Sequence, residues 1–432
     1  MRVLLLSPNR SRITVPPFPL GLACVVANLD AERHAVEVWD ALFHDNWEAA
    51  LRDRLRRFRP EVVGVSVRNV DDQEMRAPHF FVDEVRQMVA VCREESPAAL
   101  VAGGSGFSLF PAQILAYLGV DYGVIGEGER AFPRVLERLE AGCDLAGVPG
   151  AVWQEDGRIR STPLEWIEPL DGLAPADREP LDTARYYDTR GSAGIPNTAT
   201  VQSKRGCPLP CIYCSTPAIE GRTIRVRSPL FVVDEIERLR KRGFQRMHFV
   251  DSLFTNPPWH ARAICEELLR RRLDVRWSAT INPAFADPNL LGLMKRAGCV
   301  LVMVGNESGC SRMLRALRKG FERAEVERCF AACQREGLPY NAFLLLGGPG
   351  EDRESVEESI ELLERFEPNQ LTVTVGIRLY PGCELTRLAQ REGVITPATD
   401  LLRPQFYLAT GVRDWIWDHL ESVLARQPRW TS

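Results

Sequence analysis

Short apolar runs alternate with helical patterns along most of this 432-residue chain, and no other feature restricts its fold as strongly. In the first 150 residues the apolar runs predict strands at 3–6, 36–39, 61–67, 99–102 and 122–125. Helical patterns occupy 20–29, 47–58 and 80–94. Strands and helices that alternate on this scale imply right-handed crossovers, so the sequence predicts an α/β fold with a doubly wound, Rossmann-like parallel sheet.

A second alternating series predicts six further strands, at 198–202, 247–250, 275–280, 300–304, 340–346 and 370–377. Helical patterns lie between them at 232–242, 261–271, 288–297, 324–336 and 355–366. Six units are fewer than the eight that close a barrel, which favours a partial (β/α)6 barrel. We expect an N-terminal domain at 1–150, a proline-broken connector at 151–196, the barrel at 197–384 and a small helical cap at 385–432.

Composition restricts the possible partners. The chain has 54 basic and 58 acidic residues, a formal net charge of -4, so nothing predicts a nucleic acid or another polyanion as partner. We find no apolar run near the ~20 residues that span a bilayer, and expect no membrane partner. Nine cysteines are scattered without disulfide-like spacing, which indicates a reducing, cytoplasmic environment.

Three further cysteines share one short loop directly after a predicted strand. Cys207, Cys211 and Cys214 follow the spacing C-x-x-x-C-x-x-C. A [4Fe-4S] cluster normally takes four thiolates, so three would leave one iron open to another molecule. The alternative is a zinc knuckle or a group of core cysteines, but structural zinc needs four ligands in closed pairs, and no such pair lies nearby. We therefore expect the three cysteines to be metal ligands.

The cysteine loop resembles that of the radical SAM superfamily, in which the open iron binds S-adenosylmethionine (SAM). The resemblance implies a [4Fe-4S] cluster and SAM as cofactors and an external electron donor such as flavodoxin or ferredoxin. It also implies SAM contacts at polar residues near the ends of the barrel strands. These candidates are Asp251, Ser252, Ser278, Asn282, Glu307, Ser308 and Gly347. Asp251 has a structural alternative as a helix cap. After the last strand, Arg378 is expected to anchor a substrate carboxylate or phosphate in the catalytic site, or else to pair with Glu384.

The N-terminal domain resembles the cobalamin-binding Rossmann domain that precedes many radical SAM modules. The resemblance is carried by Phe18-Pro19-Leu20-Gly21, Gly103-Gly104 and Gly126-Glu127-Gly128-Glu129. It implies cobalamin contacts from the loops after the strands. The candidates are Arg68, Asn69, Gly103, Gly104, Ser105, Ser108, Gly126 and Glu127. Ordinary strand-to-helix turns remain the alternative for the glycines.

One departure from many cobalamin proteins is the absence of the D-x-H-x-x-G motif that supplies a lower axial histidine. His34, His44 and His79 lie in this half of the chain without the partners of that motif. If cobalamin binds, we expect Arg68 and Asn69 to meet its lower face.

Together the two resemblances imply a cobalamin-dependent radical SAM enzyme, most commonly a methyltransferase that acts on an unactivated carbon. One SAM would methylate cobalamin, and a second would be cleaved at the cluster to activate the substrate. We expect a small-molecule substrate, as in natural-product biosynthesis. A radical SAM enzyme that rearranges, cyclises or transfers an aminocarboxypropyl group remains an alternative, as does a non-catalytic corrinoid or Fe-S sensor. A methylthiotransferase is disfavoured because Cys24, Cys92 and Cys143 are too widely spaced for a second cluster.

Overall fold

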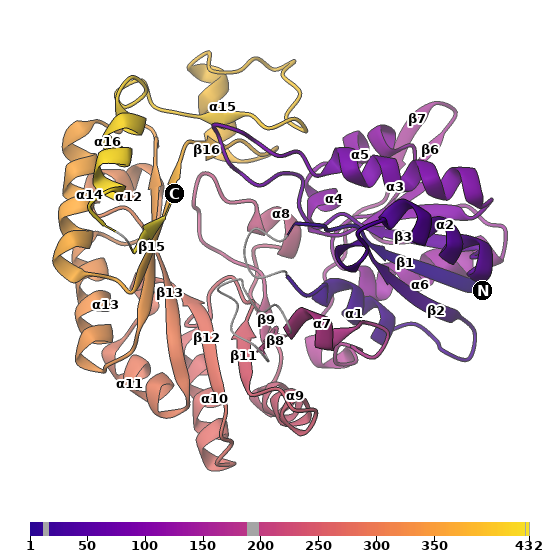
Figure 1. The fold of residues 1–432 in the computed structure, drawn as a ribbon, viewed down its shortest axis with the longest axis horizontal. Helices are drawn as coiled ribbons and strands as arrows, with labels where there is room; N and C mark the ends of the chain where they lie inside the picture. The colour runs from indigo at the N-terminus through magenta and orange to yellow at the C-terminus, as the bar shows by residue number, and fades with distance from the viewer. Residues whose placement is uncertain (12–16, 188–197, 428, 432) are drawn as a thin grey trace. The chain divides into compact units, whose positions relative to one another are not determined.

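The computed structural model describes residues 1–11, 17–187, 198–427 and 429–431. The chain divides into two compact units. The N-terminal unit comprises 1–72, 79–196 and 218–220, and the C-terminal unit comprises 73–78, 197–217 and 221–432. The predicted boundary at Pro196 falls outside the described residues, so the domain limits stay a prediction. Each unit is an α/β structure, as the sequence predicted, and is built on one seven-stranded sheet (Figure 1).

The sheet of the N-terminal unit has the strand order β2-β1-β3-β4-β5-β6-β7. Its first five strands are parallel, while β6 and β7 run antiparallel. The strands are β1 (Arg2–Ser7), β2 (Ala35–Asp40), β3 (Val62–Ser66), β4 (Ala99–Gly103), β5 (Tyr122–Val124), β6 (Ala151–Glu155) and β7 (Arg158–Ser161). The parallel order 2-1-3-4-5 is that of a doubly wound sheet, in which ligands bind beyond the carboxyl ends of the strands.

Helices accompany the strands of this sheet. They are α1 (Leu20–Ala27), α2 (Trp47–Phe58), α3 (Val82–Glu95), α4 (Ser105–Leu109), α5 (Pro111–Leu118), α6 (Gly128–Glu140) and α7 (Thr183–Tyr187). The predicted α1, α2 and α3 are confirmed to within two residues at each end. A core cluster joins β1, β3 and α6 through Val3, Leu5, Val62, Phe132 and Val135. Burial of these apolar side chains fixes the strand ends on which the loops stand.

Two parts of this unit differ from the prediction. Helices α4 and α5 follow β4 at once, where only a loop was expected. The predicted connector begins with a hairpin, because β6 and β7 extend the sheet antiparallel to β5. The first proline of the connector, Pro163, lies after these strands, which explains why the connector prolines do not prevent the hairpin.

The sheet of the C-terminal unit has the order β18-β15-β14-β13-β12-β11-β8. All its pairings are parallel, and β8 and β18 are edges, so the sheet stays open as predicted. The strands are β8 (Thr198–Val201), β11 (Arg246–Phe249), β12 (Arg276–Ile281), β13 (Cys299–Glu307), β14 (Tyr340–Leu346), β15 (Gln370–Val375) and β18 (Trp430–Thr431). The six strands from β8 to β15 are the six predicted strands.

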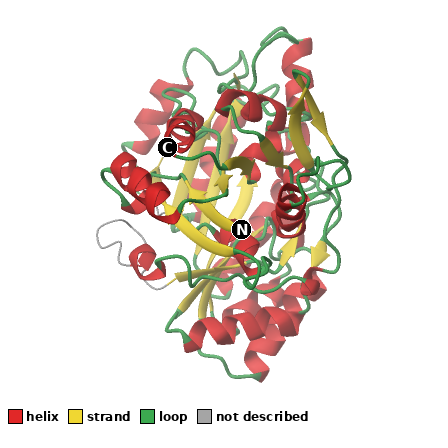
Figure 2. Ribbon diagram, turned by 90° about the vertical axis from the view of Figure 1, so that its right-hand side faces the viewer, coloured by secondary structure: helices red, strands yellow, loops and turns green. Residues whose placement is uncertain are grey.

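Helices α9 (Pro229–Lys241), α10 (Pro258–Arg270), α11 (Pro288–Arg296), α13 (Arg323–Arg335) and α14 (Arg353–Phe366) pack side by side along one face of this sheet (Figures 1 and 2). The other helices are α8 (Thr216–Glu220), which the two units share, α12 (Ser311–Ala316), α15 (Glu384–Arg391) and α16 (Ile416–Leu424). Phe249, Phe254 and Trp277 form an aromatic cluster within this unit, with ring centroids about 5 Å apart.

The C-terminal segment is more than the predicted helical cap. After α16 the chain returns to the sheet, where β18 pairs with β15 at Leu371 and Thr372. Two short pairings were also missed, between β9 (Lys204–Arg205) and β10 (Arg225–Val226), and between β16 (Ile377–Arg378) and β17 (Phe406–Tyr407). Pairs of two residues carry too little periodicity to be predicted.

Candidate functional site

The loop that carries the three cysteines is held by backbone hydrogen bonds at several points. Cys207 N donates to Gly221 O at 3.0 Å, and Cys214 N donates to Cys211 O at 3.3 Å. Between them, Ile212 N donates to Leu317 O at 3.2 Å, and Ile212 O accepts from Leu385 N at 2.9 Å. The loop that follows β8 is therefore tied to the ends of α12 and α15, which restricts the directions its thiols can take.

A buried lysine lies beside this loop. Lys319 Nζ donates to the Tyr213 hydroxyl at 3.1 Å and to Glu307 Oε1 at 3.3 Å. The side chain of Lys319 is 7% exposed and that of Glu307 is 19% exposed. Burial lowers the pKa of Lys319, but Glu307 and Cys211 more than offset it, so the pKa is raised. The ammonium therefore stays charged next to the thiols.

The donor set of the loop fits an iron-sulfur cluster. Burial raises the pKa of the Cys211 thiol to about 11, Lys319 opposes this, and Cys214 and Cys207 add to it, so the three thiols influence one another. A bound metal requires thiolates, and the lysine charge favours them. In the part of the chain that the structure describes, no three His, Cys, Asp or Glu side chains are close enough together to hold a metal ion. The ligand assignment therefore rests on the loop and its chemistry, and stays a prediction.

Glu307 is aimed by an irregularity in the sheet. Between Val304 and Glu307 the register of β13 against β14 shifts, with one extra residue in β13. Asn306 is fully buried, and its Oδ1 accepts from Phe343 N at 3.1 Å across the bulge. Glu307 has a φ of 63°, which costs a non-glycine residue on the order of 1 kcal/mol. Bulges of this kind re-aim side chains, here toward Lys319.

Asp251 has a structural role that the prediction did not anticipate. Its side chain accepts from Ser203 N at 2.7 Å, from Ser203 Oγ at 2.5 Å and from Lys204 N at 3.2 Å. Burial raises the pKa of Asp251, while Lys204 and Ser203 lower it. The carboxylate thus joins the end of β11 to the start of the cysteine loop and is 3% exposed. This geometry argues against the expected SAM contact, whereas Ser252, which is partly exposed, stays a candidate.

Two more predicted SAM contacts are buried by structural bonds. Asn282 is 2% exposed and caps a short turn by accepting from Ala284 N at 2.8 Å. Ser308 is fully buried, and its hydroxyl bonds to Ser359 Oγ and Cys310 N, both at 3.0 Å. Both side chains are thus engaged in structural bonds, which argues against the expected SAM contacts. A polar residue at a strand end also serves to satisfy backbone groups there, and sequence alone does not distinguish the two uses.

Gly347 lies at a sharp turn after β14. Its φ is 97°, and Gly347 N and Gly348 N both donate to Glu351 Oε2, the latter at 2.9 Å. Burial raises the pKa of Glu351 to about 7. The turn keeps the shape that the predicted position beside adenine would require, and this role of Gly347 stays a prediction.

Arg378 is not available to bind a substrate anion. It is 3% exposed, and its guanidinium donates to the carbonyl oxygens of Leu379 at 2.6 Å and Leu401 at 2.9 Å. Weaker bonds reach Leu402 and Gln405. The alternative pairing with Glu384 is also wrong, because Glu384 pairs with Arg387 and Arg391. The arginine fastens the segment around β17, and the catalytic assignment is corrected to a structural one.

In the N-terminal unit, two predicted loops meet at the carboxyl edge of the sheet. Arg68 O accepts from Ser105 Oγ at 2.7 Å, and Gly106 N donates to Val67 O at 2.9 Å. A side chain at Gly104 would collide with Val67 O, so this glycine, with φ of 99°, is required by the contact between loops. Arg68 and Asn69 are exposed and bond to each other, Nη1 to Oδ1, at 3.1 Å.

The remaining predicted cobalamin contacts connect this edge to neighbouring segments. Ser108 Oγ donates to Gly104 O at 2.8 Å and accepts from Gly126 N at 2.9 Å. Glu127 Oε2 accepts from Ile167 N at 2.6 Å, which attaches the connector. Gly103 is the last residue of β4. The edge is thus well ordered by its own bonds, and the residues left exposed on it, Arg68 and Asn69, fit a ligand of many polar groups.

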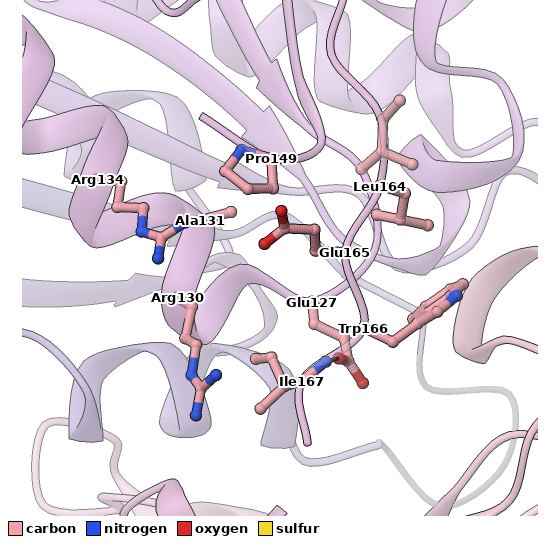
Figure 3. A pocket seen from close by; sticks show the side chains of 10 residues that line it. Glu127, Arg130, Ala131, Arg134, Pro149, Leu164, Glu165, Trp166 and Ile167 are labelled. Atoms are coloured by element: carbon pink, nitrogen blue, oxygen red, sulfur yellow. Dashed lines mark hydrogen bonds between the residues drawn. The ribbon is translucent and has the colours of Figure 1, made fainter. Parts of the chain in front are cut away.

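A cavity of about 50 Å³ lies near the same loops. Figure 3 shows Glu127 and Glu165 together with Arg130 and Arg134 of α6 around it. This volume accommodates water molecules but no cofactor of the size of cobalamin.

The three histidines of the N-terminal half have other surroundings. His34 is 5% exposed in the turn before β2, His44 stacks on Trp39, and His79 pairs with Glu84 at 2.8 Å. His34 is thus buried, and that none of the three ligates cobalt stays a prediction.

Sequence reasoning missed Lys319 and His248. Lys319 follows Arg318 in a basic, turn-like stretch, which signals exposure rather than a buried ion pair. His248 stands between the apolar Met247 and Phe249, so the alternation of the strand does place it on the opposite face. That signal was available.

No helix in the described part of the chain has the length and apolar character that a membrane span needs.

Comparison with known proteins agrees with both halves of this description. Residues 201–363 match the radical SAM superfamily, and residues 9–136 match the B12 binding domain. Tryptophan 2-C-methyltransferase of Streptomyces laurentii is 27% identical over 91% of this chain and 76% of its own length. An anaerobic magnesium-protoporphyrin IX monomethyl ester cyclase of Rubrivivax gelatinosus is 26% identical over 85% and 66%.

Among solved structures, the radical SAM methyltransferase TsrM from Kitasatospora setae, with cobalamin and a [4Fe-4S] cluster bound, superposes with a TM-score of 0.87. It is 25% identical and the match covers 100% of this chain and 92% of that one. Both families therefore occur on one chain, in the order that the fold shows, and a [4Fe-4S] cluster, SAM and cobalamin are the cofactors that they imply. The chain belongs to the cobalamin-dependent radical SAM enzymes.

Proposed function

We propose that this chain is a methyltransferase that transfers a methyl group from SAM to an unactivated carbon of a small molecule. The observation that carries the proposal is the tied three-cysteine loop with its buried Lys319, on the same chain as a B12 binding domain. The methyltransferase names of relatives that align over most of the chain support it. We place the reaction in natural-product biosynthesis.

The residues divide the work as follows. Cys207, Cys211 and Cys214 would hold the cluster, and the loop contacts at Ile212 fix their backbone. Glu307 presents carboxylate oxygens that suit a ribose diol, and Lys319 holds that carboxylate in place. When bound, the cluster would supply the electron that cleaves SAM, and cobalamin would carry the methyl group. The exposed polar groups of Arg68 and Asn69 would face cobalamin.

The test begins with oxygen-free reconstitution using iron, sulfide and cobalamin. The holoenzyme receives SAM with a labelled methyl group, flavodoxin or a chemical reductant as electron donor, and tryptophan as the first probe, because a relative acts on it. We expect label in a tryptophan-derived product. The C211S variant, reconstituted in parallel, should give none.

A second candidate is a radical reaction without methyl transfer, and the cyclase relative is the observation that favours it. Cleavage of SAM to 5'-deoxyadenosine with no label in any product would support this alternative and reject methylation. Absence of both SAM cleavage and label transfer from the reconstituted protein would reject both candidates.

A further inference from the structure

The face of the barrel sheet opposite the helices is lined by partly exposed side chains. On β11 and β12, Met247, Phe249, Ala279 and Ile281 are at most 1% exposed, and they alternate with partly exposed residues. Successive side chains of a strand point to opposite faces, so the partly exposed set shares one face, turned away from the helices of Figure 1. We call the face opposite the helices the inner face. Its side chains remain partly exposed, unlike the buried apolar side chains on the helix-covered face.

Two polar residues on this face form a pair. His248 on β11 lies opposite Ser278 on β12 in the parallel register. His248 Nδ1 and Ser278 Oγ are 3.0 Å apart, a hydrogen bond in which either atom can donate. On the other side His248 neighbours Thr200 of the edge strand β8, which leads directly into the cysteine loop. The pair thus lies on the strands that carry the candidate cluster site.

The pair offers hydrogen bonds rather than charge. Burial lowers the pKa of His248, so its imidazole is neutral near pH 7. With Nδ1 engaged by Ser278, the described part of the chain gives His248 Nε2 no hydrogen bond of its own. A neutral ring can present Nε2 as donor or as acceptor, depending on its tautomer.

Among the partly exposed residues on the described strands of this sheet, only Arg246, at the start of β11, and Glu307, at the end of β13, are charged. The uncharged ones on the face of the pair include Thr200, Thr280, Leu301, Met303, Gly305, Asn341, Phe343, Leu345, Thr372 and Thr374. Arg378, which was expected to bind a substrate anion, donates its guanidinium N–H groups to backbone carbonyl oxygens. A buried anion without a cation is costly, so this face disfavours one.

Ser278, which was expected to contact SAM, has its hydroxyl bonded to His248 instead. We propose that His248, held by Ser278, binds an uncharged polar group of the substrate, a hydroxyl or ring N–H carried on an apolar skeleton. This rests on the proposed function, because it takes the inner face of the barrel as the place of the substrate. Apolar neighbours on the same face, Leu301, Met303 and Phe343, suit such a skeleton. A phosphate or carboxylate of the substrate would have to lie elsewhere.

The test measures binding of small probes to the reconstituted holoenzyme by titration calorimetry or ligand-observed NMR. Indole and phenol carry a neutral donor, benzoate carries a charge, and toluene has no polar group. We compare wild type with H248N and H248Q. Asn can replace Nδ1 toward Ser278 but does not reach the Nε2 position, whereas Gln reaches that position, so the two variants separate the pair's internal bond from its contact with a ligand.

We expect indole and phenol to bind wild type more tightly than benzoate. H248N should raise their dissociation constants about 3- to 10-fold, the range of one neutral hydrogen bond, and leave toluene unchanged. H248Q should raise them less than about 2-fold. Equal dissociation constants in H248N and wild type, preference for benzoate, or no binding of the neutral probes would each overturn the proposal.

Two controls separate this inference from neighbouring explanations. If both H248N and H248Q lower the unfolding midpoint or the cluster absorbance, the histidine is structural and the proposal fails. Cleavage of SAM to 5'-deoxyadenosine without any probe tests the proposed function independently. Loss of SAM cleavage in a wild type that still prefers indole and phenol would refute the proposed function but keep the polar pair.

Discussion

The two units of this chain have the same kind of sheet, yet polar residues at the strand ends serve different purposes in them. In the C-terminal unit, Asp251, Asn282 and Ser308 are at most 3% exposed and bond to backbone or hydroxyl groups nearby. In the N-terminal unit, Arg68 and Asn69 are exposed and bond to each other. The buried Ser108 and Glu127 of the N-terminal unit also make such bonds. Position at a strand end therefore does not by itself predict a ligand contact, and exposure has to be considered as well.

The physical reason lies in the cost of burying polar groups. A buried donor or acceptor without a partner costs about 1–3 kcal/mol, so the buried strand ends of the C-terminal unit use side chains to satisfy their loop backbone. Exposed loops have water for this purpose. Substitutions should therefore have large effects in the C-terminal unit and small ones at the edge of the N-terminal sheet, and the predictions below test this difference.

The largest effect is expected at the cysteine loop. Replacing Cys207, Cys211 or Cys214 by Ser should reduce iron in the reconstituted protein from about four atoms per chain to nearly none, because each thiolate holds one iron. Iron and sulfide analysis with electron paramagnetic resonance would measure it. The matched control is C383S. The Cys383 thiol lies 3.5 Å from Cys214 O but outside the motif, so iron content should be unchanged. Full iron in all three loop variants would contradict the assignment.

The next effect concerns the buried ion pair. K319M should lower the free energy of unfolding by about 3–5 kcal/mol, because it leaves the Glu307 carboxylate without its cation and removes the bond to Tyr213. Urea denaturation of the reconstituted protein measures this, and SAM binding should weaken in parallel. R318M is the control, since Arg318 adjoins Lys319 but is exposed. Equal stability of the two variants would show that the buried pair contributes little.

Much of the fold was predictable because its signal is local. Periods of about two and 3.6 residues, together with loop glycines, are sufficient to place β1 to β5, the six strands β8 and β11 to β15, and half of the described helices, namely α1 to α3, α9 to α11, α13 and α14. Short pairings such as β16 with β17 and the return of β18 depend on contacts between distant segments. No window of the sequence contains that information.

The candidate site was predictable in part for the same reason. The spacing of three cysteines is local, and so is the run from Gly305 to Ser308. Arg378 and Asp251 were misread because their partners, Leu401 and Ser203, lie 23 and 48 residues away. Lys319 was missed because its burial arises from packing against Tyr213, 106 residues distant. For His248 the sequence does not show its partner Ser278, which lies 30 residues away. The alternation of the strand nevertheless shows which face of the sheet His248 occupies.

The buried carboxyl group of Glu351 in the C-terminal unit should make the stability of the protein depend on pH. Burial raises the pKa of Glu351 to about 7 in the native protein, above its ordinary value, so the unfolded chain gives up this proton at lower pH. The native state is thus favoured below the unfolded pKa and loses this advantage as pH rises through about 7. Relative to E351Q, wild type should lose about 2–3 kcal/mol of unfolding free energy between pH 5 and pH 8.

Urea denaturation at several pH values would measure this difference. E354Q is the control because Glu354 is exposed in the first turn of α14, and its stability should follow that of wild type. Parallel curves for wild type and E351Q would show that Glu351 is already ionised in the native state, held by the N–H groups of Gly347 and Gly348.

The smallest effect is expected at the exposed edge of the N-terminal sheet. In the order 2-1-3-4-5 the strand order changes direction between β1 and β3, and ligands of doubly wound sheets bind at such a point. Arg68 lies in the loop that follows β3 there. R68A should weaken equilibrium binding of hydroxocobalamin about 3- to 10-fold, since the guanidinium can contribute one or two hydrogen bonds. It should leave unfolding unchanged, because Ser105 bonds to the backbone oxygen of Arg68, which alanine keeps. R134A, on α6 beside the small cavity, is the control. A stability loss in R68A as large as that of K319M would abolish the contrast between the two units, because the exposed edge would then be as structural as the buried loop.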